Sequence, residues 1–488
     1  MKKSVKKAFL LGLSICTFSL SPMMAFAEST CFIGNNDGQF IATPTTYDAT
    51  KTYKNLGQST FYDDSSEQFL KNAEDIFIDK NDNIYVADTG NNRVIKMTRD
   101  GQVELVVTAA AETELVEPKG VYVHDDNTIW IADTGNRRIV VVDENGNTVR
   151  EYGKPESEVL GSNFTFDVEK IYVNNMGYIY ALKGANIMRI NSKNEFQGYM
   201  GAMDVGFSLS RYLIKTFGSK EMREKSARVE PTAYNNFMIV RDGTIYGVLS
   251  DGSSGQIRRL NTTGDNTYPQ LAFGYDIWEE GAYEPTTATF MDVTVSADGM
   301  VTVLDQGTGL IYQYDQEGNL LTTFGGLGTR TGKFSVPTSI AQDSEGNLYV
   351  LDYSANNITV FEPTEFVDLI HTAINYQKDG KYEDAKEYWE KVLAIDANYM
   401  VAHNGIGKIL YKEEAYQDSM KDYKMGDYVD GYSSAFAEYR HNLFRKYFGW
   451  IVIALIVLLV AVVKGFTLLR RKANQWTYNI EMKGDIDP

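Results

Sequence analysis

Hydrophobic and polar residues alternate with a period of two along most of the chain, a pattern that indicates short β-strands. Six segments repeat one order of elements: strand, polar turn, strand, polar turn, strand. They begin at Asp75, Gly120, Lys170, Asn236, Asp292 and Ser339. Repeats of about 40–50 residues are typical of propeller blades. The pattern therefore predicts a six-bladed β-propeller over residues 28–363, with an insertion at 204–229 between the third and fourth blades.

A fourth, outer strand follows several of these repeats, at residues 102–107, 148–153 and 320–325. The sixth repeat has no such strand after it. Residues 45–53, TTYDATKTY, precede the first repeat and are rich in β-forming residues. We expect this segment to supply the missing outer strand of the sixth blade, because closing the ring removes exposed strand edges.

The pentapeptide ADTGN occurs twice, in IYVADTGNNRVIKM and in IWIADTGNRRIVVV. Asp and Asn side chains bond nearby backbone N–H groups in turns, and Gly90 and Gly135 are expected to take positive φ angles. Each arginine that follows is expected to pair with the aspartate of its own motif or with a neighbouring blade; the pairs are Arg93 with Asp88 and Arg138 with Asp133. We interpret the motif as a repeated structural joint and not as a repeated active site.

The stretches EPKGVYV…IWIADTGNRRIVVVDENG and AEDIFIDKNDNIYVADTGNNRV resemble NHL repeats, and the resemblance covers roughly residues 45–363. The third and fourth repeats depart from it, because ALKGAN and VLSDGSSGQ stand where the others have ADTGN. The resemblance is to membrane-anchored bacterial NHL-repeat proteins, and it implies a mainly β fold built on an NHL-type propeller.

After the sixth repeat the hydrophobic period changes to 3.6, which indicates helices. Similar segments begin at Tyr382 and Tyr416, and the small residues Ala385 and Ser419 occupy matching places in them. Residues 364–430 resemble two tetratricopeptide units, whose repeat is about 34 residues. The segment is interpreted either as a groove for a peptide or protein, or as a spacer that lifts the propeller off a membrane.

The two ends of the chain indicate its compartment. Residues 1–27 have the basic, apolar and small-x-small regions of a cleaved signal peptide. The mature chain then keeps one cysteine, Cys31, which we expect to be an unpaired thiol near a loose terminus. Residues 447–469 are apolar enough to cross a bilayer, and they follow a juxtamembrane helix predicted at 431–446.

These features place the propeller outside the cell membrane on a single span and leave residues 470–488 as a short cytoplasmic tail. The basic residues Arg470, Arg471 and Lys472 favour a cytoplasmic end for the span. The formal net charge of −18 argues against a nucleic-acid partner, since such surfaces are usually basic.

Two neighbouring positions at the start of each inner strand are candidates for the rim of a central funnel. From them and from one exposed aromatic residue we select a ligand-binding set: Glu74, Asp75, Lys119, Glu169, Lys170, Asn235, Asp292 and Trp278. The carboxylate and amide oxygens in this set are hard ligands of the kind that calcium prefers. Lys119 and Lys170 share the same ring, however, and would repel a cation or neutralise its ligands.

The sequence gives little support for catalysis. The mature propeller contains one histidine, His124, and one imidazole cannot build a zinc site of the lyase type. No G-x-S-x-G motif occurs in the chain. We therefore predict no catalytic residue, no metal and no cofactor, and we keep a calcium-dependent lactonase or hydrolase of the gluconolactonase-like type as the alternative.

The favoured function is a non-catalytic surface receptor or scaffold. Its propeller would bind a saccharide, a peptide or a protein and hold that partner at the membrane through residues 447–469. Assistance to a membrane complex such as a transporter is an expectation from the architecture alone.

Overall fold

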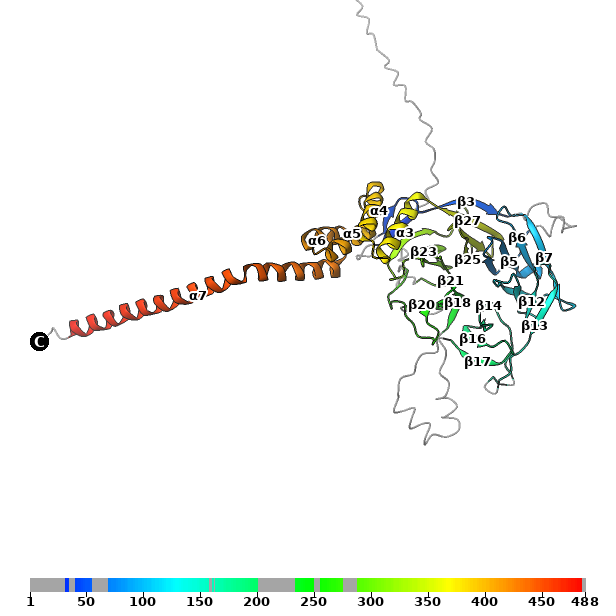
Figure 1. The fold of residues 1–488 in the computed structure, drawn as a ribbon, viewed down its shortest axis with the longest axis horizontal. Coiled ribbons are helices and arrows are strands. Elements are labelled where there is room, and N and C mark those ends of the chain that lie inside the picture. The colour runs from blue at the N-terminus through cyan, green and yellow to red at the C-terminus, as the bar shows by residue number, and fades with distance from the viewer. Residues whose placement is uncertain are drawn as a thin grey trace, which may run out of the picture.

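The computed structural model describes residues 31–34, 40–54, 69–157, 160–161, 163–200, 233–249, 255–274 and 288–484. The predicted signal peptide, the insertion at 204–229 and Trp278 lie outside these ranges. The described chain forms a ring of sheets, followed by a group of helices and one long terminal helix (Figure 1). The predicted mainly β fold with six blades is confirmed.

The first three blades are antiparallel sheets whose strands follow chain order from the hub outward. Blade 1 contains β4 (Asp75–Ile78), β5 (Ile84–Asp88), β6 (Arg93–Met97) and β7 (Val103–Val107). A two-stranded ribbon, β8 (Ala109–Ala110) and β9 (Thr113–Glu114), comes next. Blade 2 contains β10 (Pro118–Val123), β11 (Ile129–Asp133), β12 (Arg138–Val142) and β13 (Thr148–Tyr152). Blade 3 contains β14 (Lys170–Val173), β15 (Ile179–Lys183), β16 (Asn186–Ile190) and β17 (Phe196–Tyr199).

The last three blades differ from one another at their outer edges. Blade 4 has three strands in its described part, β18 (Tyr234–Ile239), β19 (Ile245–Leu249) and β20 (Ile257–Leu260). Blade 5 contains β21 (Phe290–Val295), β22 (Val301–Asp305), β23 (Leu310–Tyr314) and β24 (Leu320–Gly325), and it is widened by β1 (Cys31–Gly34) and β2 (Phe40–Thr43). Blade 6 contains β25 (Pro337–Gln342), β26 (Leu348–Asp352) and β27 (Asn357–Pro363).

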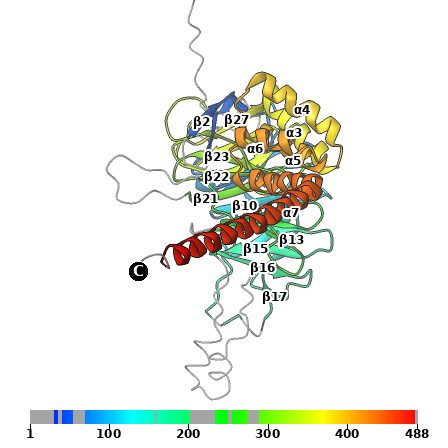
Figure 2. The ribbon, with the colours of Figure 1, turned by 90° about the vertical axis from the view of Figure 1, so that its left-hand side faces the viewer.

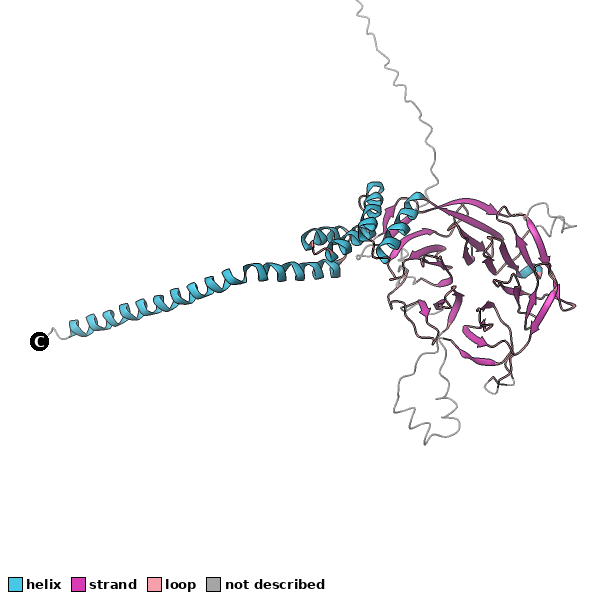
Figure 3. Ribbon diagram, viewed as in Figure 1, coloured by secondary structure: helices cyan, strands magenta, loops and turns pink. Residues whose placement is uncertain are grey.

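The ring is closed by β3 (Tyr47–Tyr53), which lies antiparallel to β27 as the outermost strand of blade 6. Tyr47 pairs with Pro363, and Tyr53 pairs with Ile358. The closure expected from residues 45–53 is therefore confirmed. The closed ring of strands is visible in Figure 3.

The core lies between the blades, because the central strands are buried on both faces. Ile84 and Val86 of β5 pack into one cluster with residues of blade 6, whereas the alternate residues Tyr85 and Ala87 pack against blade 2. A strand covered on both sides has no polar face, which explains runs such as IYVA and VTVL.

The ADTGN segments join each blade to its neighbours. In blade 2 the buried Asp133 accepts hydrogen bonds from Val116 N–H at 2.8 Å and from Arg138 Nε at 2.7 Å. Thr134 Oγ1 donates to the carbonyl of Val168, just before blade 3, at 2.6 Å. Blade 1 repeats these contacts with Asp88, Arg93 and Thr89. The interpretation of the motif as a structural joint is confirmed.

The expected positive φ angles at Gly90 and Gly135 are wrong. The left-handed residues of the two turns are Asn92, with φ 52°, and Arg137, with φ 56°. Glycine is needed for close approach instead: a Cβ on Gly135 would lie 2.7 Å from the carbonyl oxygen of Val116, and one on Gly90 would lie 2.5 Å from that of Lys71.

Cys31 is not at a loose terminus. It is 1% exposed in β1 at the edge of blade 5, where Thr46 N–H and Thr46 Oγ1 both lie 3.4 Å from its sulfur. The thiol is free, as expected, and it is buried, so the expectation of a loose terminus at this residue is wrong.

Five helices follow the propeller in the described chain: α3 (Glu365–Lys378), α4 (Tyr382–Ile395), α5 (Met400–Lys412), α6 (Tyr416–Met425) and α7 (Val429–Gly484). The first four form two antiparallel hairpins, α3–α4 and α5–α6, in the segment where a tetratricopeptide pair was predicted. The hairpin arrangement is observed, and the tetratricopeptide resemblance itself stays a prediction.

The hairpins are fixed to blade 5 by a shared core and by buried polar contacts. Met300 and Leu321 of blade 5 belong to the same apolar cluster as helix residues such as Trp389. Tyr399 Oη donates to the Leu321 carbonyl at 2.8 Å, and His371 Nε2 lies 2.7 Å from Gln313 Oε1. The helices are thus packed onto the ring and do not hang from it by a linker.

Helix α7 runs without a break through the predicted juxtamembrane segment, the predicted span and most of the predicted tail. Residues 429–478 form one helix that is long and apolar enough to cross a membrane. The helix leaves the ring at its edge and lies in the plane of the face-on view (Figure 1); Figure 2 shows it pointing toward the reader, past the side of the ring.

A buried histidine makes the α5–α6 hairpin sensitive to pH. His403 Nδ1 lies 2.9 Å from Asp422 Oδ1, and its Nε2 lies 3.0 Å from the Ala397 carbonyl. Both ring nitrogens thus face acceptors, an arrangement that only the protonated imidazolium satisfies. The hydrogen bond to Asp422 accordingly raises the pKa of His403 above its ordinary value.

We expect His403→Gln to lower the free energy of unfolding by about 1.5–3 kcal/mol at pH 5.5 and by much less at pH 9. A raised pKa means that the folded state binds the proton more tightly. The stabilisation is therefore complete below about pH 6.5 and is lost as pH rises through the higher pKa of the folded state. Thermal unfolding of both proteins from pH 5.5 to 9 measures this difference, and a gap that stays constant with pH would contradict it.

Candidate functional site

The first residues of the inner strands form a polar ring around one mouth of the propeller. Glu74 and Lys119 form an ion pair there, with 3.2 Å between Oε2 and Nζ, and each side chain is 29% exposed. Burial raises the pKa of Glu74; Lys119 opposes this shift, and Glu169 and Asp75 add to it. Asn235 Nδ2 donates to the Phe290 carbonyl at 2.8 Å. Glu74, Lys119 and Glu169 thus lie near one another, and the assignment of these residues and Asn235 to a ligand-binding mouth stays a prediction.

The residues after Glu74 and Glu169 are buried, and so are the residues at the matching positions of the inner strands of blades 5 and 6. Asp75, Lys170 and Asp292 are 2%, 4% and 2% exposed, and Ser339 is fully buried. Lys170 Nζ pairs with Asp75 Oδ1. Ser339 Oγ donates to Asp292 Oδ2 at 2.6 Å and lies 3.2 Å from Asp75 Oδ1. We call these four residues the hub cluster.

Backbone N–H groups satisfy the remaining carboxylate oxygens of the hub cluster. Asp75 Oδ2 accepts from Val121 N–H at 2.9 Å. Asp292 accepts from Ile340 N–H at 2.9 Å and from Val293 N–H at 2.8 Å. Because these groups come from blades 1, 2, 3, 5 and 6, the cluster ties five inner strands together.

The hub cluster places one ammonium beside two carboxylates. Burial alone would lower the pKa of Lys170, but the facing Asp75 carboxylate outweighs this effect and raises it. Burial raises the pKa of Asp292, against the opposing effect of Lys170. Lys170 therefore stays charged and supplies the positive charge that the buried carboxylates need.

The difference from the sequence interpretation is one of depth. Asp75, Lys170 and Asp292 were predicted at the funnel mouth, but they are buried in this structure. Alternate residues of a strand point to opposite sides, so a shift of one position separates a rim residue from a hub residue. The hub position of blade 2 is Gly120, where a Cβ would lie 2.4 Å from the Glu169 carbonyl oxygen.

The hub cluster does not suit calcium. Its carboxylate oxygens already accept hydrogen bonds from Lys170, Ser339 and backbone N–H groups, so a cation would have to displace a buried ammonium. Within the part of the chain that the structure describes, no group of three or more His, Cys, Asp or Glu side chains is placed to hold a metal ion.

An aromatic layer beneath the hub cluster was missed from the sequence. The ring centroids of Phe77 and Tyr122 are 5.2 Å apart, those of Tyr122 and Tyr172 are 5.0 Å apart, and those of Tyr172 and Phe237 are 5.3 Å apart. Burial raises the pKa of Tyr172, so its phenol stays neutral. Phe77, Tyr122 and Tyr172 each stand two residues after a hub position, a spacing that could have placed them on the channel side.

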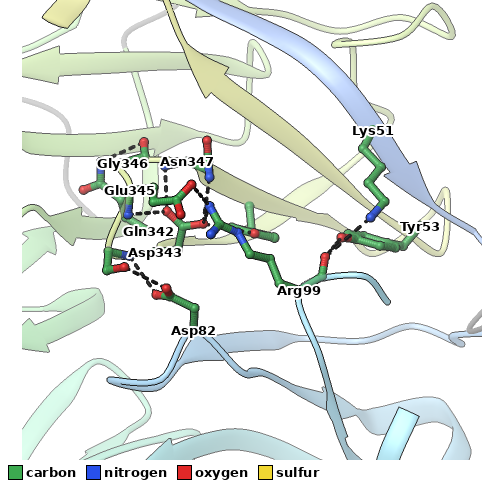
Figure 4. A network of polar contacts seen from close by, with 11 residues as sticks. Lys51, Tyr53, Asp82, Arg99, Gln342, Asp343, Glu345, Gly346 and Asn347 are labelled. Atoms are coloured by element: carbon green, nitrogen blue, oxygen red, sulfur yellow. Dashed lines mark hydrogen bonds and ion pairs between the residues drawn. The ribbon is translucent and has the colours of Figure 1, made fainter. Parts of the chain in front are cut away.

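A second polar depression, of about 450 Å³, lies at the seam where blade 6 meets blade 1, and it was also missed. Arg99 of blade 1 pairs there with Asp343, at 3.0 Å, and with Glu345 of blade 6 (Figure 4). The closing strand β3 contributes Tyr53 Oη, which donates to the Arg99 carbonyl. The contacts of Arg99, Lys51 and Tyr53 in this depression join blade 1 to blade 6 across the seam.

The comparisons agree with the fold. The NHL repeat family model matches residues 115–142, which contain the first three strands of blade 2. Among curated protein sequences, none matches this chain.

Solved structures with a similar fold share little sequence with the chain. A catalytically inactive virginiamycin B lyase from Staphylococcus aureus with quinupristin is 13% identical, with 68% of this chain and 87% of that chain covered and a TM-score of 0.40. A structural genomics protein of unknown function from Bacteroides thetaiotaomicron is 14% identical, with 67% and 80% covered and a TM-score of 0.44. At these identities and with TM-scores below 0.5, the two structures carry no argument about this chain. The chain is a six-bladed β-propeller protein that carries an NHL repeat in its second blade.

Proposed function

We propose that this protein is a non-catalytic, membrane-anchored binding or scaffold protein. Its propeller would present the mouth ring to a saccharide, peptide or protein outside the cell, and α7 would hold it in the membrane. A role in support of a membrane complex such as a transporter fits this arrangement. The proposal includes the cleaved signal peptide at residues 1–27 and a cytoplasmic end at 470–488.

The observation that carries the proposal is the hub cluster. Its buried charged groups already have partners, so the partly exposed Glu74 and Lys119 are the charged groups left to meet a ligand. Glu74 and Lys119 offer both charges at about 3 Å from each other, which suits a polar ligand bound across the ring by hydrogen bonds. The tight packing of the helices on blade 5 would hold this surface at a fixed position relative to α7.

The binding proposal is tested with charge reversals at the mouth. The full-length protein in detergent is applied to an array of neutral and acidic oligosaccharides and peptides, beside Lys119→Glu and the double variant Glu74→Lys with Lys119→Glu. We expect a ligand of the wild-type protein to lose tenfold or more in affinity with Lys119→Glu. The double variant keeps an ion pair between these two positions and so should preserve the local fold. It therefore separates a loss of folding from a loss of binding.

Lys408→Ala serves as a control, because Lys408 lies on α5 and pairs with Glu317, away from the mouth. It should leave binding unchanged. Binding that is insensitive to the mouth variants would contradict the proposal.

The lactonase alternative predicts a different result. We expect calorimetry of the full-length protein to give no tight calcium binding and a lactone series to give no turnover above background. Tight calcium binding and turnover that are both lost in Glu169→Gln and Asp292→Asn would replace the binding proposal with the enzyme. The hub contacts of Lys170 are the physical reason for the expected result, since they occupy the carboxylates that calcium would need.

A further inference from the structure

The contact between α3 and blade 5 contains a histidine whose imidazole faces the propeller. Nε2 of His371 lies 2.7 Å from Oε1 of Gln313 in β23. Gln313 is fully buried, and its Nε2 donates to Tyr47 Oη at 2.8 Å and to Thr302 Oγ1 at 3.2 Å. The amide is thus held by β3 and β22 with its oxygen toward the imidazole. Nε2 of His371 therefore carries a proton, and a second proton would bind at Nδ1.

The groups around His371 favour the neutral imidazole. Its hydrogen-bond partner is the uncharged amide of Gln313 and not a carboxylate, so an imidazolium would lose hydration in exchange for a neutral acceptor. Two carboxylates face the ring, Asp298 from the turn between β21 and β22 and Asp368 from α3 itself. Asp298 Oδ2 already accepts a hydrogen bond from Asn375 Nδ2 at 3.0 Å. Burial lowers the pKa of His371, and the two carboxylates oppose this shift without cancelling it.

A second histidine of the helices has the opposite arrangement. His403 Nδ1 lies 2.9 Å from a carboxylate oxygen of Asp422, and this hydrogen bond raises the pKa of His403. Its hydrogen-bond partners lie in α6 and in the segment before α5. Acid therefore strengthens a contact inside the helix hairpins, whereas it weakens the contact that joins them to blade 5.

The covalent link between the propeller and the helices is short. Strand β27 ends at Pro363 and α3 begins at Glu365, so Thr364 alone connects them. Thr364 N–H donates to the Thr46 carbonyl at 3.0 Å, which holds this link on the closing strand. Helices that leave blade 5 would thus stay beside it, and the contact can form again.

We propose that the α3–blade 5 contact is sensitive to pH, and that protonation of His371 in acid releases the helix hairpins from the propeller while both parts stay folded. Release frees the propeller from its fixed position relative to α7. The proposal rests on the packing of the helices on the ring, and it does not depend on which ligand the propeller binds.

The sign of the effect follows from proton linkage. The docked state binds the second proton of His371 less tightly than the released state, in which the imidazole is hydrated. Docking therefore weakens as pH falls from about 6.5 toward the lower pKa of the docked state. Because one proton is involved, the released fraction can rise by at most about tenfold for each pH unit.

The test measures release by the labelling of buried thiols in the full-length protein in detergent. Met300→Cys is the main probe, because Met300 is fully buried in blade 5 within the apolar cluster that it shares with the helices. The native Cys31, which shares a cluster with Val367 of α3, gives the same reading without a change at Met300. A pyridyl disulfide reagent labels the thiols, peptide mass spectrometry separates the sites, and the exposed Ser434→Cys gives the intrinsic rate at each pH.

We expect the labelling of Met300→Cys, divided by the intrinsic rate, to rise about threefold or more from pH 7.5 to pH 5. Adding His371→Gln should remove most of this rise, because glutamine does not titrate. Val140→Cys is the control for unfolding, since Val140 is fully buried in blade 2, away from the helices; its labelling should stay unchanged.

Three results would overturn the proposal. The first is equal labelling of Met300→Cys and of Cys31 at both pH values. The second is a rise that persists in full with His371→Gln, which would assign the pH dependence to another group. The third is an equal rise at Val140→Cys, which would mean that acid unfolds the propeller and does not release the helices.

Discussion

Replacing Lys170 by methionine is expected to lower the free energy of unfolding of the propeller by about 3–5 kcal/mol. Methionine fills similar volume, so the loss comes from charge and not from a cavity. Asp75 and Asp292 would remain 2% exposed each with no cation beside them. Urea denaturation of the detergent-solubilised chain, followed by circular dichroism, measures the change.

The pH dependence of this loss of stability distinguishes a lost charge pair from lost packing. Burial raises the pKa of Asp292, and Lys170 opposes that shift, so without Lys170 this buried carboxyl should bind a proton more readily in the folded state than in the unfolded chain. Stability then falls as pH rises through the raised pKa of Asp292, so the deficit of the variant should be largest near neutral pH and shrink in acid. Adding Asp75→Asn should recover part of the loss at neutral pH. A deficit that is the same at every pH would indicate lost packing instead.

Lys119→Met is the matched control, because the two lysines occupy neighbouring positions on neighbouring inner strands. Lys119 pairs with Glu74 at the rim, where both side chains are 29% exposed. Exposed pairs contribute about 1 kcal/mol or less. Similar losses for the two lysines would contradict the division into an exposed mouth and a buried hub cluster.

The blades were predictable from the sequence because the features that specify them lie between residues close to one another in the chain. Runs such as IYVAD and IWIAD, the polar turns and the regular spacing each report a strand that is buried on both faces. The closure by β3 was predictable for a related reason: a six-bladed ring with one outer strand missing leaves an open edge, and residues 45–53, just before the first repeat, are rich in β-forming residues.

Depth along the channel was not predictable, because it depends on how the six inner strands tilt toward one another. Glu74 and Asp75 are neighbours in sequence and equally acidic, yet one is at the rim and the other pairs with Lys170, 95 positions away. The burial of Cys31 was missed for the same kind of reason. Its contacts with Thr46 depend on a strand order in which β1 joins blade 5, and no local pattern encodes that order.

The second large effect is expected at the joint between blades 1 and 2. Asp133→Ala should lower the free energy of unfolding by about 3–5 kcal/mol. Asp133 is fully buried, and Arg138, at 6% exposed, keeps Nε 2.7 Å from its carboxylate. The substitution leaves the buried guanidinium of Arg138 without its carboxylate partner. It also removes the acceptor of Val116 N–H, so the linker that leads into blade 2 loses a hydrogen bond that fixes it.

Glu151→Ala isolates the buried part of this effect, because Glu151 contacts the same arginine from the exposed side. Its Oε2 lies 3.4 Å from Arg138 Nη1, and its side chain is 44% exposed. Such a contact is worth about 1 kcal/mol or less. Asp133→Asn should fall between the two, since an amide still accepts from Val116 N–H but carries no charge for Arg138. Urea denaturation of the three variants therefore ranks them by the charge left unpaired at Arg138; a Glu151→Ala loss as large as that of Asp133→Ala would mean that the exposed contact, and not the buried one, secures the joint.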